Sequence, residues 1–87
     1  MAVVRIPSLL QSLTGGTAVV ELPGHTVREV FDALDRAYPG IGARLMEDGQ
    51  LRPELAVGVD GEIAPLGLLQ PVRDDSEIVI MPAVGGG

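Results

Sequence analysis

One amphipathic helix with β-type segments on both sides restricts the fold more than any other feature of the sequence. Thr26 and Glu29 form a T-x-x-E capping box, which satisfies the free amides at a helix N-terminus. The next residues place apolar side chains on one helix face: Val27, Val30, Phe31, Leu34 and Ala37. Pro39-Gly40 ends the helix. Because no second long helix is available to bury this stripe, the helix must cover a sheet.

Four segments have the β-branched content or the alternation of strands: residues 2–6, 17–22, 56–59 and 78–81. The connection between the first two is short enough for antiparallel pairing. The last segment is apolar without alternation, which is typical of a central strand with both faces covered. The order of elements predicts an α+β domain, in which one main helix covers a mixed sheet of four to five strands.

The connecting segments have weaker signals. Ser8 and Gln11 match a capping box for one helical turn, and Ala43–Met46 is a second expected turn. Residues 47–54 are interpreted as a polar loop, and Ile63–Pro71 as irregular because prolines interrupt it. Asp60-Gly61 predicts a hairpin turn.

Composition excludes several classes of function. The 87 residues suffice for one small domain, and 12 acidic against 6 basic residues give a net charge of −6, which argues against a nucleic-acid partner. Cysteine is absent, so disulfides and thiolate chemistry are excluded. No apolar run has the length of a membrane span and no targeting signal is apparent. We therefore expect a soluble, cytoplasmic protein with no membrane partner.

Candidate side-chain chemistry is sparse. His25, the single histidine, is interpreted as an exposed loop residue just before the helix, with a catalytic base as the alternative. Asp74-Asp75 matches no calcium-loop spacing, so no metal site is predicted. All of the net negative charge lies in residues 47–87, which predicts either a solvated surface or a docking surface for a basic partner.

The tail Gly85-Gly86-Gly87 directly follows the last expected strand. Glycine has no Cβ, so such a tail can thread a narrow channel that rejects side chains. An α-carboxylate is ionised at neutral pH, and inside a partner enzyme it can attack the α-phosphate of ATP. The product is an acyl-adenylate, which sulfur or amine nucleophiles open. The alternative is an incidental terminus or a cloning remnant.

With this tail, the chain resembles the ubiquitin-like β-grasp sulfur carriers of the ThiS/MoaD family, and within that family the CysO-type carriers. The resemblance covers nearly the whole chain. It rests on the following stretches: Ile6-Pro7, Thr14-Gly15-Gly16, Gly24-x-Thr26-Val27, Tyr38-Pro39-Gly40-Ile41, Arg44-Leu45 and Ile80-Met81-Pro82-Ala83-Val84-Gly85-Gly86-Gly87. One departure is Gly85, where such carriers often have alanine. The extra glycine should raise the entropy cost of ordering the tail.

The resemblance implies a protein cosubstrate without enzyme activity of its own. An E1-like enzyme uses ATP to adenylate Gly87, and a sulfur donor converts the adenylate to a thiocarboxylate. The chain itself binds no cofactor. Implied partners are this enzyme, a sulfur-accepting synthase such as a cysteine synthase or a thiosugar synthase, and a metalloprotease that releases cysteine. The implied organisation is a β-grasp domain over residues 1–84 and a flexible tail over residues 85–87. Implied partner-binding residues are Ile80, Pro82, Ala83, Val84, Gly85 and Gly86.

Three alternatives remain open. The chain could be the small subunit of a molybdopterin synthase, a ubiquitin-like modifier joined through Gly87 to target lysines, or a binding module whose glycines are incidental. A carrier also needs a docking face. The last strand places Ile78 and Ile80 on one face and Val79 and Met81 on the other. We expect one of these faces to meet the helix and the other to form an exposed apolar patch for partners, with Leu66, Leu68 and Leu69 nearby; the alternative is that a loop covers this patch.

Overall fold

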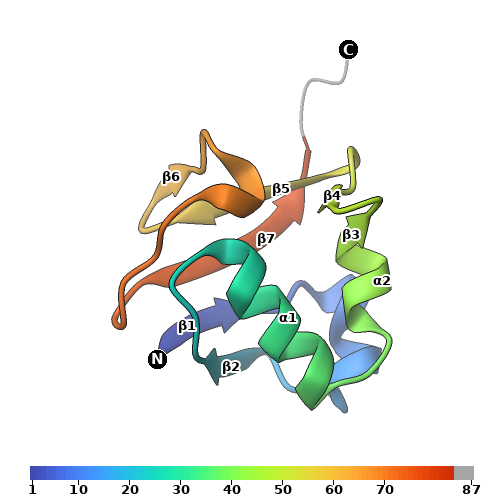
Figure 1. Cartoon of the computed structure of the whole chain (residues 1–87). Helices are drawn as coiled ribbons and strands as arrows, with labels where there is room; N and C mark the ends of the chain where they lie inside the picture. The colour runs from blue at the N-terminus through green and yellow to red at the C-terminus, as the bar shows by residue number, and fades with distance from the viewer. Residues whose placement is uncertain (84–87) are drawn as a thin grey trace.

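The computed structural model describes residues 1–83, and Val84–Gly87 lie outside this range. Figure 1 shows helix α1 packed across a twisted sheet, with the shorter helices and a small hairpin beside it. The elements in chain order are β1 (Ala2–Arg5), η1 (Ser8–Thr14, a 3-10 helix), β2 (Val19–Leu22), α1 (Val27–Ala37), α2 (Ile41–Leu45), β3 (Met46–Glu47), β4 (Gln50–Leu51), β5 (Leu55–Val59), β6 (Glu62–Ile63), η2 (Gly67–Leu69, also 3-10) and β7 (Glu77–Pro82).

The sheet has five strands in the order β2-β1-β7-β5-β6. Strand β1 pairs antiparallel with β2 and parallel with β7, and β5 pairs antiparallel with both β7 and β6. The predicted mixed sheet and the central position of β7 are therefore confirmed. Because β1 and β7 run parallel, the carboxyl end of β7 lies at the same end of the sheet as the start of η1. Leu22, paired with Ala2, lies at the opposite end.

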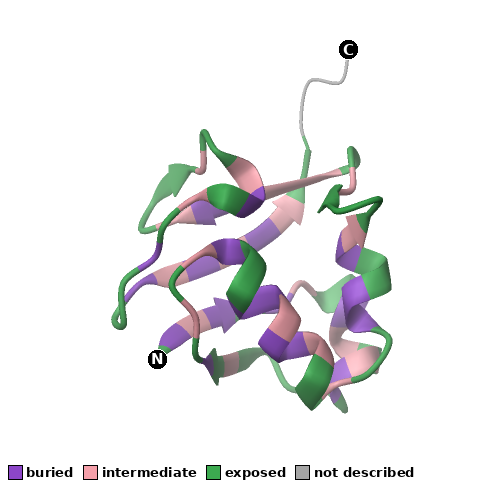
Figure 2. Ribbon diagram, in the orientation of Figure 1, coloured by how far each residue is buried: buried purple, intermediate pink, exposed green. Residues whose placement is uncertain are grey.

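The core lies between α1 and one face of the sheet. Phe31 and Leu34 of α1 are fully buried, as is Ile78 of β7. Figure 2 shows the buried positions of α1 and of the central strands facing one another. This arrangement confirms that the apolar stripe of the helix covers the sheet. Strand β7 differs from the prediction, because only its Ile78 and Ile80 face is covered, whereas Val79 and Met81 are half-buried.

The capping box of α1 forms with one difference from the standard pattern. The Thr26 hydroxyl accepts a hydrogen bond from the Glu29 amide at 3.2 Å. The Glu29 carboxylate accepts one in return from the amide of His25, at 3.0 Å, and not from that of Thr26. At the other end of the helix, the Asp35 carboxylate accepts hydrogen bonds from the amides of Gly40 and Gly42. One side chain of α1 therefore also fixes the start of α2.

Two predictions about the connections are wrong. Ser8 does not cap its helix, because Pro7 occupies the N-cap position and no side chain caps that end. The supposed polar loop of residues 47–54 contains the β3-β4 hairpin, in which Met46 pairs with Leu51. The segment Ile63–Pro71 is mostly irregular, as expected, although it contains the end of β6 and the short η2.

Asp60 links the β5-β6 turn to the loop that precedes β7. Its carboxylate accepts hydrogen bonds from the Glu77 amide and from the Ser76 hydroxyl, both at 2.9 Å. The Arg73 guanidinium lies 3.6 Å away. The Glu77 amide bond, then the Ser76 bond and the Arg73 charge lower the pKa of Asp60 from its ordinary value of 3.8. The ionised carboxylate thus holds the start of β7 in register.

Replacement of Asp60 by asparagine is expected to lower the melting temperature at neutral pH. It should also make the melting temperature fall less steeply as the pH is lowered. Because the folded pKa lies below the unfolded one, the stabilisation is present above the unfolded pKa and is lost as the pH falls through the lower folded value. Thermal melts between pH 2 and pH 7 measure both effects. The matched control is Asp74→Asn, in the same loop, because Asp74 makes no ion pair or side-chain hydrogen bond within residues 1–83. Equal melting curves for both variants would contradict this account.

Candidate functional site

The carboxyl end of β7 is held by the start of β5. Pro82 pairs with Leu55 of β5, and the Ala83 amide donates a hydrogen bond to the Glu54 carbonyl at 2.9 Å. Both Pro82 and Ala83 are exposed. The end of β7 therefore has a fixed position in the sheet, in the upper part of the view in Figure 1.

The predicted site residues separate into three groups. The predicted reactive residue Gly87 and the predicted contacts Val84, Gly85 and Gly86 lie outside the described residues. Pro82 and Ala83 are accessible at the end of β7, so partner binding by them remains a prediction. Ile80 is only 3% exposed and belongs to the core under α1. Its burial does not fit a direct side-chain contact with a partner, and the neighbouring Met81 is the more accessible residue.

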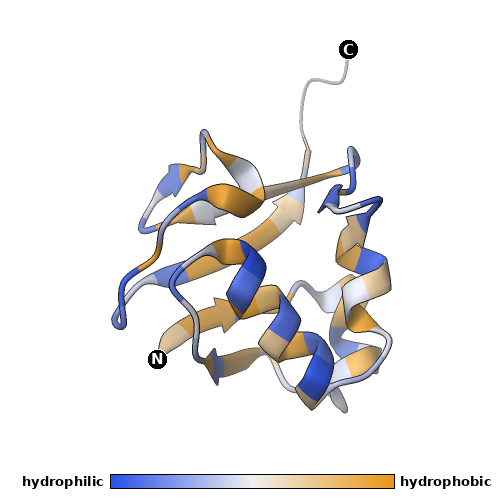
Figure 3. Cartoon of the chain, in the orientation of Figure 1, coloured by the Kyte–Doolittle hydropathy of each residue, from blue (hydrophilic) through white to orange (hydrophobic). Residues whose placement is uncertain are grey.

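The sheet face opposite α1 is partly apolar. Val3, Val79, Ala56 and Met81 are half-buried there. Gly58 leaves room for Met81, because a Cβ at Gly58 would lie 3.0 Å from the Met81 methyl carbon. The orange bands of Figure 3 follow the same central strands. The expected separation of Ile78 and Ile80 from Val79 and Met81 is confirmed, and the half-buried second pair lies on the face away from α1. Partner docking on this face stays a prediction.

The expected contribution of the leucines near residue 67 to that face is wrong. Leu68 is buried in the core beneath α1. Leu66 and Leu69 are exposed and line a depression with Leu51 of β4 and Arg28 of α1. These leucines therefore lie on the helix side of the sheet, because η2 packs against α1.

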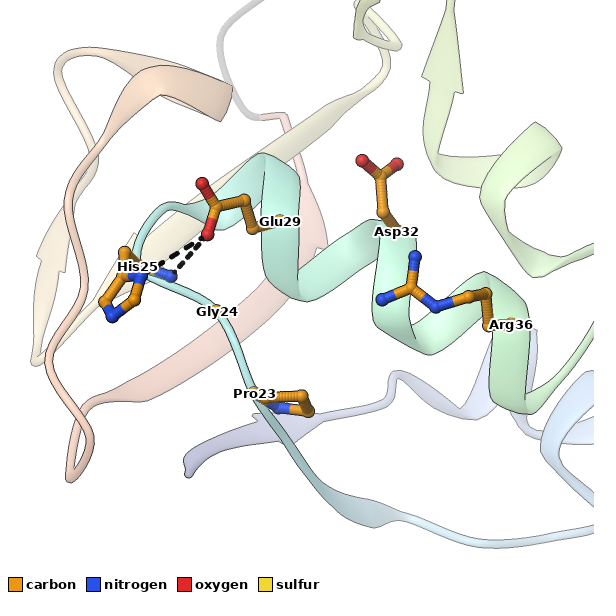
Figure 4. Close-up of a pocket in the computed structure, with 6 residues that line it drawn as sticks. All are labelled: Pro23, Gly24, His25, Glu29, Asp32 and Arg36. Atoms are coloured by element: carbon orange, nitrogen blue, oxygen red, sulfur yellow. Dashed lines mark hydrogen bonds and ion pairs between the residues drawn. The ribbon is translucent and has the colours of Figure 1, made fainter.

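A second depression lies at the N-terminal end of α1 (Figure 4). The His25 imidazole lies 3.6 Å from the Glu29 carboxylate, and its side chain is 89% exposed. Asp32 and Arg36 complete the polar lining, and no hydroxyl nucleophile is among the lining residues. The interpretation of His25 as an exposed loop residue is confirmed. This depression lies next to Pro23, at the end of the sheet opposite the end of β7.

A groove flanks the end of β7, and sequence reasoning did not find it. We call it the exit groove. Arg44 of α2 lines it, together with the apolar residues Pro7, Leu9, Leu10, Leu55, Met81 and Pro82. These residues come from four separate segments. Only the parallel pairing of β1 with β7 brings η1 beside Pro82, so no local pattern in the sequence could have indicated the groove.

Other kinds of site have no support in residues 1–83. No cluster of three or more histidine, aspartate or glutamate side chains in this range could hold a metal ion. Within the same range, no helix is long and apolar enough to cross a bilayer.

Comparisons with known proteins agree with this geometry. Residues 4–87 match the ThiS family. The chain is 35% identical over 89 aligned residues to the sulfur carrier protein CysO of Mycobacterium tuberculosis, with 97% of this chain and 96% of the relative covered. A chain in the crystal structure of the BexX/CysO complex of Amycolatopsis orientalis superposes with a TM-score of 0.91 at 37% identity, with 100% of both chains covered. Small archaeal modifier protein 3 of Haloferax volcanii is 36% identical over 64 residues, with 71% of this chain and 70% of that protein covered.

The chain therefore belongs to the ThiS family, and its fold is the ubiquitin-like β-grasp that the sequence predicted. The resemblance to CysO-type carriers is likewise confirmed, since both sequence and structure place CysO proteins among its relatives over nearly the full length.

Proposed function

We propose that the chain is a sulfur carrier and that its reactive group is the carboxylate of Gly87. The observation that carries this proposal is its similarity to CysO proteins over nearly the full chain, with the ThiS family match extending to residue 87. The fold supports it, because Pro82 at the end of β7 and the following Ala83 are both exposed and accessible to a partner. The chain acts as a protein cosubstrate in this scheme.

Activation requires ATP and an E1-like enzyme. An oxygen of the Gly87 carboxylate attacks the α-phosphorus of ATP, the bond between the α- and β-phosphates breaks, and pyrophosphate leaves. Hydrosulfide then attacks the acyl carbon of the adenylate. The bond to AMP breaks, AMP leaves with its electron pair, and loss of the sulfur proton gives the thiocarboxylate.

The sulfur is then used in biosynthesis. The thiocarboxylate sulfur attacks an electrophilic carbon held by a sulfur-accepting synthase, such as a cysteine synthase or a thiosugar synthase. Where the product stays attached to the carrier, a metalloprotease releases it. The similarity to a chain of the BexX/CysO complex supports a stable protein partner, because that structure holds CysO together with a second protein.

The experiment that tests this function is an activation assay. The purified chain is incubated with ATP, hydrosulfide and the E1-like enzyme of the same organism, and its intact mass is recorded. We expect a gain equal to the difference between sulfur and oxygen, which depends on ATP. An unchanged mass with an enzyme that is active on another carrier would contradict the proposal.

Protein modification is a second candidate, favoured by the similarity to an archaeal modifier protein. In that case the Gly87 acyl group forms an amide with a lysine of a target. The chain itself contains no lysine, so it cannot form lysine-linked polymers. The mass of the chain in cell extracts distinguishes the two functions. A modifier gives high-mass adducts linked through target lysines, whereas a carrier gives the free chain with a thiocarboxylate.

A further inference from the structure

We propose that the exit groove receives an apolar side chain of the enzyme that adenylates Gly87, with a carboxylate of that enzyme beside Arg44. The inference rests on the proposed function and adds to it a surface and a partner chemistry. The groove lies between η1, α2 and the paired ends of β5 and β7.

The length of chain beyond the described residues restricts where the partner lies. Four residues separate Ala83 from the end of the chain. Fully extended, they span at most about 14 Å. An enzyme that holds the Gly87 carboxylate in its ATP site must therefore lie within that distance of Ala83. The neighbouring Met81 and Pro82 form one wall of the exit groove, so the surface around the enzyme's ATP site must approach this groove.

The groove has the apolar surface that a docking site needs. Leu9 of η1 is 74% exposed, whereas its neighbour Leu10 is only 2% exposed and belongs to the core. Exposed leucine surface next to a groove gains free energy when a partner covers it. Leu9 lies on η1, and residues from η1, β5 and β7 together form the walls of the groove.

Charge in the groove adds specificity. Arg44 is exposed and forms no ion pair within residues 1–83, whereas Arg5, Arg28, Arg52 and Arg73 each have a carboxylate within 4 Å. An unpaired guanidinium on an acidic protein attracts a carboxylate of the partner and fixes its orientation. Glu54 also lines the groove but forms no ion pair with Arg44. The predicted partner surface is therefore an apolar side chain next to an acidic one.

The test is a kinetic comparison of matched variants in ATP–pyrophosphate exchange catalysed by the adenylating enzyme of the same organism. Leu9→Asp is compared with Leu69→Asp, because both leucines are 74% exposed on 3-10 helices and only Leu9 lines the exit groove. Arg44→Glu is compared with Arg36→Glu, since Arg36 also lacks an ion pair within residues 1–83 but lies at the far depression. Thermal melts verify that each variant is folded.

We expect Leu9→Asp and Arg44→Glu to raise the KM for the carrier about tenfold or more without changing kcat, because the groove docks the partner and takes no part in chemistry. The two control variants should remain within about twofold of the unchanged chain. Equal kinetics for Leu9→Asp and Leu69→Asp would overturn the proposed docking role of the groove but leave the proposed function standing. A defect in sulfur transfer to the synthase with normal activation would also overturn it, in favour of the synthase as occupant. If the enzyme fails to adenylate even the chain without substitutions, the result would count against the proposed function itself.

Discussion

Removal of Gly87 is expected to abolish thiocarboxylate formation and to leave the thermal unfolding of the domain unchanged. The shortened chain still ends in a glycine carboxylate, but that carboxylate lies one residue, about 3.5 Å, short of the reacting phosphate. A misplacement of only about 1 Å can cost about 100-fold in rate, so the loss should be at least that large. Stability should not change, because the deletion leaves every buried core residue found within residues 1–83 in place.

The measurement is the rate of ATP-dependent conversion of the shortened and full chains by the same enzyme, together with a thermal melt of each. A chain extended by one residue is the matched control, because it displaces the carboxylate by the same length in the other direction. It should fail equally. Normal conversion of either variant would show that the position of the carboxylate is unimportant, contrary to the proposed chemistry.

Replacement of Phe31 by alanine is expected to cost about 3–5 kcal/mol of unfolding free energy. Phe31 is fully buried between α1 and the sheet, and it is the largest fully buried side chain within residues 1–83. The free energy of unfolding of a small domain is only about 5–15 kcal/mol, so the variant should retain little of it. Urea unfolding followed by circular dichroism gives the difference.

Leu69→Ala is the control for this prediction, because Leu69 is 74% exposed and little apolar surface is lost when it is truncated. Its unfolding free energy should stay within about 0.5 kcal/mol of the unchanged chain. A Phe31→Ala variant as stable as Leu69→Ala would mean that the core does not depend on α1 in the way described.

The sequence predicted most reliably those elements whose signals are local. Thr26, Glu29 and the apolar stripe identified α1 because a capping box and a helical period are both contained within one element. The β3-β4 hairpin was missed because its strands have two residues each. Its turn, Asp48-Gly49, has positive φ at both residues and is the same Asp-Gly signal that correctly indicated the turn at Asp60-Gly61.

Features that depend on long-range pairing could not be predicted. The period of two in β7 separates Ile80 from Met81 but does not say which face α1 covers, so the burial of Ile80 could not be predicted when the resemblance implied that it contacts partners. The contact of Asp60 with Ser76 and the position of Leu9 beside Pro82 both arise from strand pairing. In contrast, the family resemblance could be recognised from motifs spread along the chain, and the comparisons confirm it.

The central claim is tested most directly by locating the sulfur after activation. Arg73 is the last basic residue, so trypsin releases a single peptide that begins at Asp74 and ends at Gly87. After incubation with the adenylating enzyme, ATP and hydrosulfide, fragmentation of this peptide should assign the exchange of oxygen for sulfur to Gly87. A peptide of unchanged mass, or sulfur at any other residue, would contradict the account.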